Sequence, residues 1–250
     1  MITPGNRQIG LALHHHAGDY DGSIPGPLNA MQDSFDKPNR GLINLSVYLG
    51  GYPEEPIGQK LLTWRWHKSY MSPSDPTLSL LTPEINGYHA TYISSYAANV
   101  SATETEPNIT SGFQDGLSNT IFAAERFCYL PSVSFGNPAE FHLFSIGQGS
   151  ISNFLRIVVG ERRASFADRG YFDVVPATSG FPPVSRPSRA GVTFQAKPLF
   201  PECDVHQLQS PYASGLQVAM FDGSVRFLRK DISETAFWGM TTRNAGDIAE

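Results

Sequence analysis

Three consecutive histidines, His14, His15 and His16, are the residues of this sequence that most resemble a metal-binding site. A transition metal needs several ligand atoms that converge on one point. Consecutive residues of a helix point about 100° apart, so three neighbours on a helix cannot reach one ion. We therefore expect histidines on the faces of a helix rather than ligands, and no transition metal, either here or at His206.

The turn Asp115-Gly116 offers a second set of candidate ligands. Ser118 and Asn119 follow it closely, and carboxylate, hydroxyl and amide oxygens are the donors that calcium prefers. The alternative is that these side chains bond their own backbone, as in Asx and Ser/Thr turns. The sequence favours the turn interpretation, and calcium is the one cofactor left open.

Motifs of the common catalytic sites are absent from the sequence. It has no GxGxxG or Walker-type loop, no GxSxG elbow and no HExxH. Cys128 and Cys203 show no CxxC spacing and are too few for a zinc site. They are either two separate buried thiols or one disulfide that closes a long loop in an oxidising compartment. We predict that the protein is not an enzyme.

The composition excludes further classes of protein. The chain has 250 residues and a formal net charge of −5, so it has no basic field to attract a nucleic-acid backbone. A hydrophobic fraction of 40% excludes global disorder. No run approaches the ~18 apolar residues that span a membrane, and the first residues lack the pattern of a signal peptide.

Periodicity predicts the elements that must hold these residues within a single domain. Apolar residues at helical spacing predict a helix over 6–17, which Gly18 ends. Strands are expected over 89–100 and 121–127, and 132–200 is expected to be a loop-rich insertion. A short helix capped by Ser233 is expected at 233–240.

The strongest local pattern is a hairpin over 216–228. Asp222-Gly223 between two alternating runs is typical of a two-residue type I′ turn. That turn would pair Met220 with Val225 and Val218 with Phe227, giving one buried apolar face.

Several short blocks, in order along the chain, resemble one family. They are 6–14 followed by 22–25, 72–76, 94–99, 115–121 with Glu125, and 210–227. These blocks are similar to those of DUF1559 proteins, which are prepilin-like proteins abundant in Planctomycetes. The family-motif positions are Asp115, Gly116, Ser118, Asn119, Glu125, Tyr212, Asp222 and Gly223.

The sequence departs from the family pattern at three places. Met71 replaces a cysteine, and Tyr212 stands where the C-terminal H-X9-DG block has its histidine, with His206 nearby at the wrong spacing. Family members begin with a leader and a long apolar helix, in whose place this chain has residues 1–5. The resemblance therefore implies either an incomplete N-terminus or a member without its anchor.

The resemblance implies an α+β, pilin-like architecture, in which the end of an N-terminal helix packs on an antiparallel sheet. It also implies an extracytoplasmic or surface location, other pilin-like subunits as partners, and membrane contact only through the missing helix. Both cysteines fall where cysteines recur in the relatives, which favours a Cys128–Cys203 disulfide if the runs that carry them are neighbours.

Our leading hypothesis is a non-enzymatic, pseudopilin-like structural, assembly or surface protein. The alternative is an extracytoplasmic carbohydrate- or ligand-binding module that uses exposed aromatic residues, namely Trp64, Trp66, Tyr88 and Tyr92. A hydrolase comes third, because no nucleophile has a visible base partner.

Overall fold

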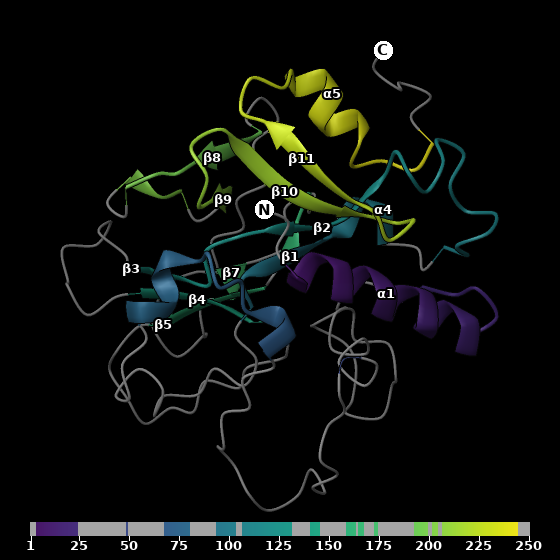
Figure 1. Ribbon diagram of the computed structural model, residues 1–250, viewed down its shortest axis with the longest axis horizontal. Coiled ribbons are helices and arrows are strands. Elements are labelled where there is room, and N and C mark those ends of the chain that lie inside the picture. Colours follow the sequence, from purple (N-terminus) through teal and green to yellow (C-terminus); the bar gives the residue numbers. More distant parts are fainter. Residues whose placement is uncertain are drawn as a thin grey trace, which may run out of the picture.

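The protein forms an α+β fold around a central sheet (Figure 1). The structure is a computed structural model, and it describes residues 4–24, 49, 68–80, 94–103, 107–131, 141–145, 159–163, 165–167, 173–174, 193–199, 202–204 and 207–244. Among these residues, no helix has both the length and the apolar character that a membrane crossing requires.

The helices are short apart from the first. They are α1 (Pro4–Asp19), the 3-10 helices η2 (Lys68–Tyr70) and η3 (Pro76–Leu80), α4 (Val100–Thr103) and α5 (Glu234–Gly239). The strands are β1 (Tyr96–Asn99), β2 (Ile121–Glu125), β3 (Tyr129–Pro131), β4 (Phe141–Ser145), β5 (Val159–Arg163), β6 (Ser165–Phe166), β7 (Asp173–Val174), β8 (Phe194–Ala196), β9 (Leu208–Ser210), β10 (Gly215–Met220) and β11 (Val225–Arg229).

The central sheet has the strand order β11-β10-β2-β1-β6. Its first four strands are antiparallel, as the sequence predicts for the fold class, whereas β6 joins β1 in parallel. A second sheet has the order β3-β4-β5-β7, and β8 pairs with β9 in a third. The described parts of the predicted insertion thus form short strands, and one of them extends the central sheet.

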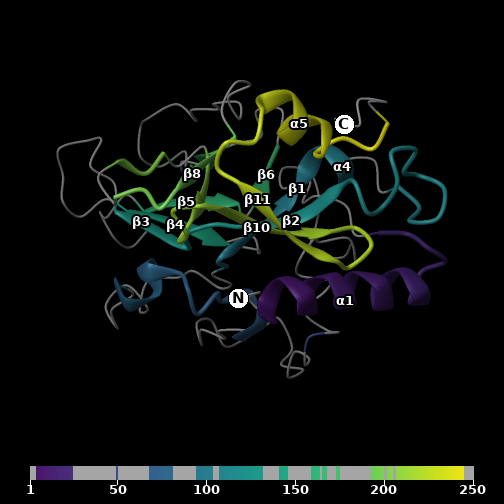
Figure 2. The ribbon, with the colours of Figure 1, turned by 45° about the horizontal axis from the view of Figure 1, so that its top comes forward.

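Helices cover both faces of the central sheet, with α1 on one side and α5 on the other (Figure 2). Under α1, Ile9 and Leu13 pack in one core cluster with Phe122. Under α5, Phe237 packs in a second cluster with Val218. Strands β2 and β10 lie between the two clusters and are buried along their whole length, so they lack the alternation of a half-exposed strand.

Both predicted helices form. The first runs from Pro4 to Asp19, slightly beyond the predicted 6–17, and α5 begins after Ser233, whose hydroxyl accepts a bond from Ala236 N at 3.2 Å. Of the strand predicted at 89–100, only Tyr96–Asn99 is a described strand, and residues 89–93 lie outside the described ranges.

The terminal hairpin forms, but its predicted turn is wrong. Gly223 N donates to Met220 O at 3.0 Å, and Met220 N donates to Ser224 O at 2.8 Å. The turn therefore contains three residues, 221–223, in a type I turn followed by Gly223 with a φ of 80°. The additional residue is Phe221, which is fully buried and packs against Phe122 with ring centroids 5.0 Å apart.

The predicted hairpin register is consequently wrong by one residue. Val225 pairs with Ala219 and Phe227 pairs with Gln217. A one-residue shift moves side chains to the other face of a strand. Phe227 is therefore 46% exposed, and it does not share a buried face with Val218.

Candidate functional site

A buried group of polar side chains lies where the segment 68–80 meets one end of β1 and β2. We call it the Asp75 cluster, and its members are Ser72, Asp75, Thr77, Ser95, Glu125 and Cys128. All six are buried. Because buried polar groups are costly unless they are hydrogen-bonded, such a group is the first place to look for chemistry.

The Asp75 carboxylate is the centre of this cluster. Its Oδ1 accepts bonds from Thr77 N at 2.9 Å and Thr77 Oγ1 at 2.6 Å. Its Oδ2 accepts bonds from Ser95 Oγ at 2.7 Å and Cys128 N at 2.9 Å. One carboxylate thus joins η3, the start of β1 and the residue that follows β2 by three positions.

This geometry leaves no lone pair of the Asp75 carboxylate free to accept a substrate proton or to bind a metal ion. An ionised carboxylate has about four lone-pair sites, and the four donors of Thr77, Ser95 and Cys128 fill them. A general base needs a free lone pair directed at a substrate proton, and a metal ligand needs one directed at the ion. Asp75 therefore serves as a structural anchor between three segments.

Two further side-chain bonds join the segment 68–80 to β2 and to the residues that precede β10. Ser72 Oγ donates to Glu125 Oε1 at 3.3 Å, and Glu125 is only 1% exposed. Nearer the surface, Tyr212 Oη donates to Ser74 Oγ at 3.0 Å. The pKa of Tyr212 is raised, mainly by burial and also by the charge of Glu125, although the Ser74 bond opposes this shift. Tyr212 therefore stays a neutral phenol at physiological pH.

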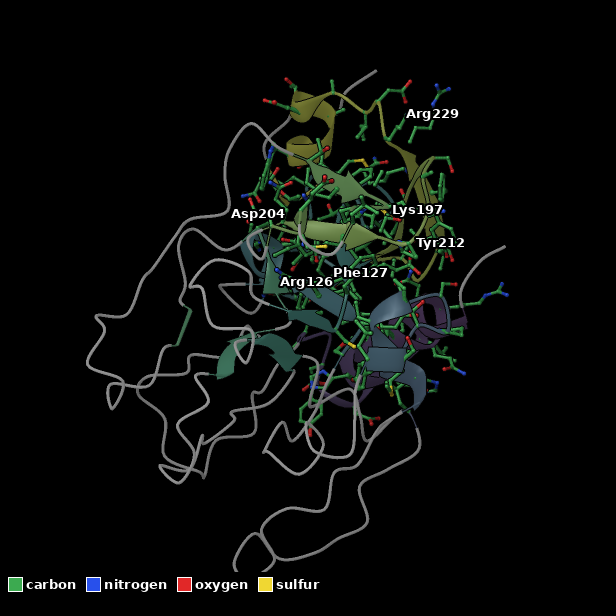
Figure 3. All side chains as sticks on the ribbon, turned by 90° about the vertical axis from the view of Figure 1, so that its left-hand side faces the viewer. Arg126, Phe127, Lys197, Asp204, Tyr212 and Arg229 are labelled. Carbon is green, nitrogen blue, oxygen red and sulfur yellow. The ribbon has the colours of Figure 1, made fainter. Side chains whose placement is uncertain are left out.

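These contacts bring together four of the sequence blocks. Residues 72–76, Ser95, Glu125 and Tyr212 come from separate parts of the chain and meet at one end of β1 and β2. Tyr212, for which the resemblance predicts a histidine, lies at the outer edge of this assembly. Figure 3 shows its side chain on the same side of the molecule as Arg229.

The other motif residues meet at the opposite end of the same strands. Asn119 Nδ2 donates to Asp115 O at 2.9 Å, and Thr120 Oγ1 donates to Gly116 O at 3.2 Å. Gly116 has a φ of 88°, and Ser118 is half-buried in the same turn. These bonds to the turn's own backbone are of the kind that the turn interpretation predicts.

The two Asp-Gly turns are neighbours. Asp222 N donates to Leu117 O at 3.2 Å, and Phe221 N donates to Thr120 O at 3.0 Å. Asp222 Oδ1 accepts a bond from Ser224 N at 2.8 Å, which closes its own turn. Close to these turns, the side-chain amide of Asn99 links the end of β1 to β2 and to the residues that follow α5. It donates to Ile121 O at 2.7 Å and to Thr241 O at 2.9 Å.

The three histidines lie on α1 as predicted, at different depths. His15 is exposed, His14 is half-buried and His16 is buried. His16 Nδ1 lies 3.2 Å from Ser23 O, and its ring stacks on Tyr20 at 4.5 Å between centroids. Burial lowers the pKa of His16, against opposing effects of the Ser23 carbonyl and Asp19.

Within the described ranges, no three or more residues of the metal-ligand types His, Cys, Asp and Glu come together in a group that could hold an ion. His206 lies outside those ranges, as do Trp64, Trp66, Tyr88 and Tyr92, the aromatic residues of the alternative binding hypothesis.

The disulfide inferred from the resemblance is not formed. Both cysteines are free thiols, with Cys128 buried and Cys203 half-buried. Cys128 Sγ lies 3.4 Å from Thr77 Oγ1, inside the Asp75 cluster, and Cys203 Sγ lies 3.5 Å from Leu199 O. Each sulfur thus has its own polar neighbour.

The Asp75 cluster was only partly visible in the sequence. The sequence marks the block 72–76 through the family resemblance, but not the role of Asp75 as an acceptor for distant donors. The one available signal was the Asp75-Pro-Thr77 spacing, which is typical of a side chain that bonds the backbone two residues on.

Comparisons with known proteins add no relative. No family model, no curated protein and no solved structure matches this chain.

Proposed function

We propose that this protein is a non-enzymatic, pseudopilin-like subunit of an extracytoplasmic or cell-surface assembly, similar to the DUF1559 proteins that its sequence blocks resemble. The observation that carries the proposal is the position of α1. It lies along one face of an antiparallel sheet and buries Ile9 and Leu13 there, while its outer face stays exposed. This arrangement is consistent with the end of a pilin-like helix.

The bonding of the motif residues supports a structural role. Asp75 is saturated by four donors, and the side chains of Asn99 and Asn119 bond backbone carbonyls. A catalytic site directs free polar groups at a space that a substrate can enter. The side chains of Asp75, Asn99 and Asn119 instead bond other parts of the same chain, which favours a structural role over catalysis.

The exposed face of α1 is the surface through which we expect a neighbouring subunit to bind. Leu11 is 59% exposed near the middle of the helix, with Arg7 and His15 exposed on either side of it. Residues four positions apart lie on one helix face, so these three side chains form one stripe. An exposed apolar residue between two polar side chains suits contact with another subunit.

Cross-linking in the source organism tests the proposal. In a Cys203→Ser background, Leu11→Cys places a reactive thiol on the exposed stripe of α1. Cells expressing this variant are treated with a membrane-impermeant bis-maleimide. We expect covalent multimers that contain the protein, and we expect external protease to digest it in intact cells.

A matched control is Thr235→Cys, which is exposed on α5 at the opposite face of the sheet. It should react with the reagent but form no multimers. Protein that stays protected from external protease would contradict the extracytoplasmic location. Equal cross-linking of both variants would contradict assembly through α1.

A further inference from the structure

Among the described strands, β11 is an edge strand of the central sheet. It is the outermost strand beside β10, and it has five residues, whereas the edge strand at the other end, β6, has two. Long edge strands present unpaired backbone groups that another extended chain can complete. β11 therefore has the geometry of a docking edge.

The hydrogen-bond pattern identifies which backbone groups are free. Met220 N bonds Ser224 O, and Lys230 N bonds Ser214 O, so the even-numbered positions from 224 to 230 face β10. In an antiparallel pair the intervening residues point their N–H and C=O groups the other way. The backbone groups of Val225 and Phe227 therefore point away from the sheet, and the described residues provide no hydrogen-bond partner for them.

The exposed side chains along this edge include the aromatic ring of Phe227 on one face, which Arg229 shares, and two further cations on the other. Phe227 is 46% exposed and meets Tyr212 edge-on at 6.1 Å between centroids. Arg226 and Lys230 are exposed on the other face, and within the described part of the chain neither makes an ion pair. Arg229, by contrast, is already paired with Asp231 at 2.7 Å.

We propose that β11 binds an extended acidic segment of another protein as an additional antiparallel strand. Cations on an edge deter a neutral or basic strand, because pairing brings like charges together without compensation. A second copy of β11 would bring the same Arg226 and Lys230 and is disfavoured for that reason. An acidic segment turns the same two charges into attractions.

The register of β11 specifies the pattern of the partner. Pairing opposite 226 and 230 places acidic residues four positions apart, and an apolar residue next to the second one would lie opposite Phe227. Read from its N-terminus, the partner segment meets position 230 first and position 226 last, so its motif is Glu-x-x-apolar-Glu. The apolar side chain would cover the exposed ring of Phe227 beside Tyr212.

A designed peptide tests the proposal without knowledge of the natural partner. The probe is acetyl-Thr-Glu-Thr-Val-Phe-Glu-Thr-amide, and its control has lysine in place of both glutamates. Binding is followed by NMR titration of the whole chain, and by hydrogen exchange of the Val225 and Phe227 amides. We expect the acidic peptide to bind about tenfold more tightly than the basic one and to slow exchange at both amides.

Two further experiments distinguish strand addition from simple charge attraction, one with a protein variant and one with a modified peptide. The double variant Arg226→Glu/Lys230→Glu should reverse the preference and bind the basic peptide more tightly. A peptide N-methylated at the residues whose N–H groups face β11 should lose binding, although its charge is unchanged. No binding of the acidic peptide at millimolar concentration, shifts that map away from β11, or dimerisation of the chain through β11 would each overturn the proposal.

Discussion

Gly10 of α1 lies directly against Gly223 of the hairpin turn between β10 and β11. A Cβ placed on Gly10 would come within 3.0 Å of the Gly223 Cα and 3.4 Å of its carbonyl oxygen. Since the neighbour is backbone, it cannot rotate away as a side chain could. The contact sets how closely α1 can approach the hairpin, and it places the His14 ring above the same turn.

Gly10→Leu should therefore destabilise the fold by about 1–3 kcal/mol, because the larger side chain must push α1 away from the turn. The matched control is Gly18→Ala in the same helix, where an added Cβ has no neighbour within 4 Å. Relief of glycine's conformational entropy should make that variant neutral or more stable by up to about 1 kcal/mol. Urea unfolding of both variants measures the difference, and equal effects would contradict the close contact.

Gly223→Val should destabilise the hairpin by more than about 1 kcal/mol, because Gly223 has a φ of 80° and a β-branched residue tolerates the left-handed region badly. Space is not the obstacle, since the nearest atom to an added Cβ is in the His14 ring at 3.5 Å. Gly223→Asn should lose much less stability, because asparagine adopts the left-handed region more readily. Thermal melts that rank the two variants equally would show that the turn is of another type.

The hairpin shows what sequence patterns could and could not predict. The Asp222-Gly223 pair marked the turn, and the spacing of apolar residues marked α1, because both signals are local. The register of the hairpin depended on whether Phe221 belonged to the strand β10 or to the turn, from which its ring enters the core. It entered the core because Phe122 and Phe113 surround it there, and those contacts bridge about a hundred residues. The parallel addition of β6 to β1 is non-local in the same way.

Both cysteines should titrate as free thiols in denaturant without any reductant. In the native protein they should react slowly with iodoacetamide at pH 8, since thiolate is the reactive form. Burial, and then the nearby Asp75 charge, raise the pKa of Cys128 well above its usual value. Burial also raises the pKa of Cys203 to about 11. Mass spectrometry that finds a 128–203 cross-link in unreduced protein would contradict this prediction.

The stability of the fold should fall as the pH drops from about 7 toward 5, in part because of His16. Burial lowers the folded-state pKa of His16 below the ordinary value of 6.5, so the unfolded chain binds a proton more readily in this window. The free energy of unfolding therefore rises with pH until the unfolded-state pKa is passed. His16→Gln should flatten this slope, and urea unfolding that showed an equally steep slope in the variant would contradict the prediction.

The Asp75 cluster illustrates why the candidate site was harder to predict than the elements. The segment 72–76 was recognisable as a polar turn from its prolines and serines. The donors that define the role of Asp75 are Ser95, 20 residues away, and Cys128, 53 residues away. No spacing rule joins residues so distant, because only the folded chain brings Asp75 next to the residues that precede β1 and follow β2.

Asp75→Asn should cost about 3 kcal/mol or more of stability, although its shape is nearly unchanged. The amide nitrogen cannot accept a bond, so the donors on one side, either Thr77 or the pair Ser95 and Cys128, lose their partner inside the protein. The matched control is Asp231→Asn, which removes an exposed ion pair with Arg229 and should change stability only slightly. Denaturant unfolding measures both values. If Asp75→Asn unfolded no more easily than Asp231→Asn, Asp75 would not be an anchor, and a role in binding or catalysis would have to be considered for it instead.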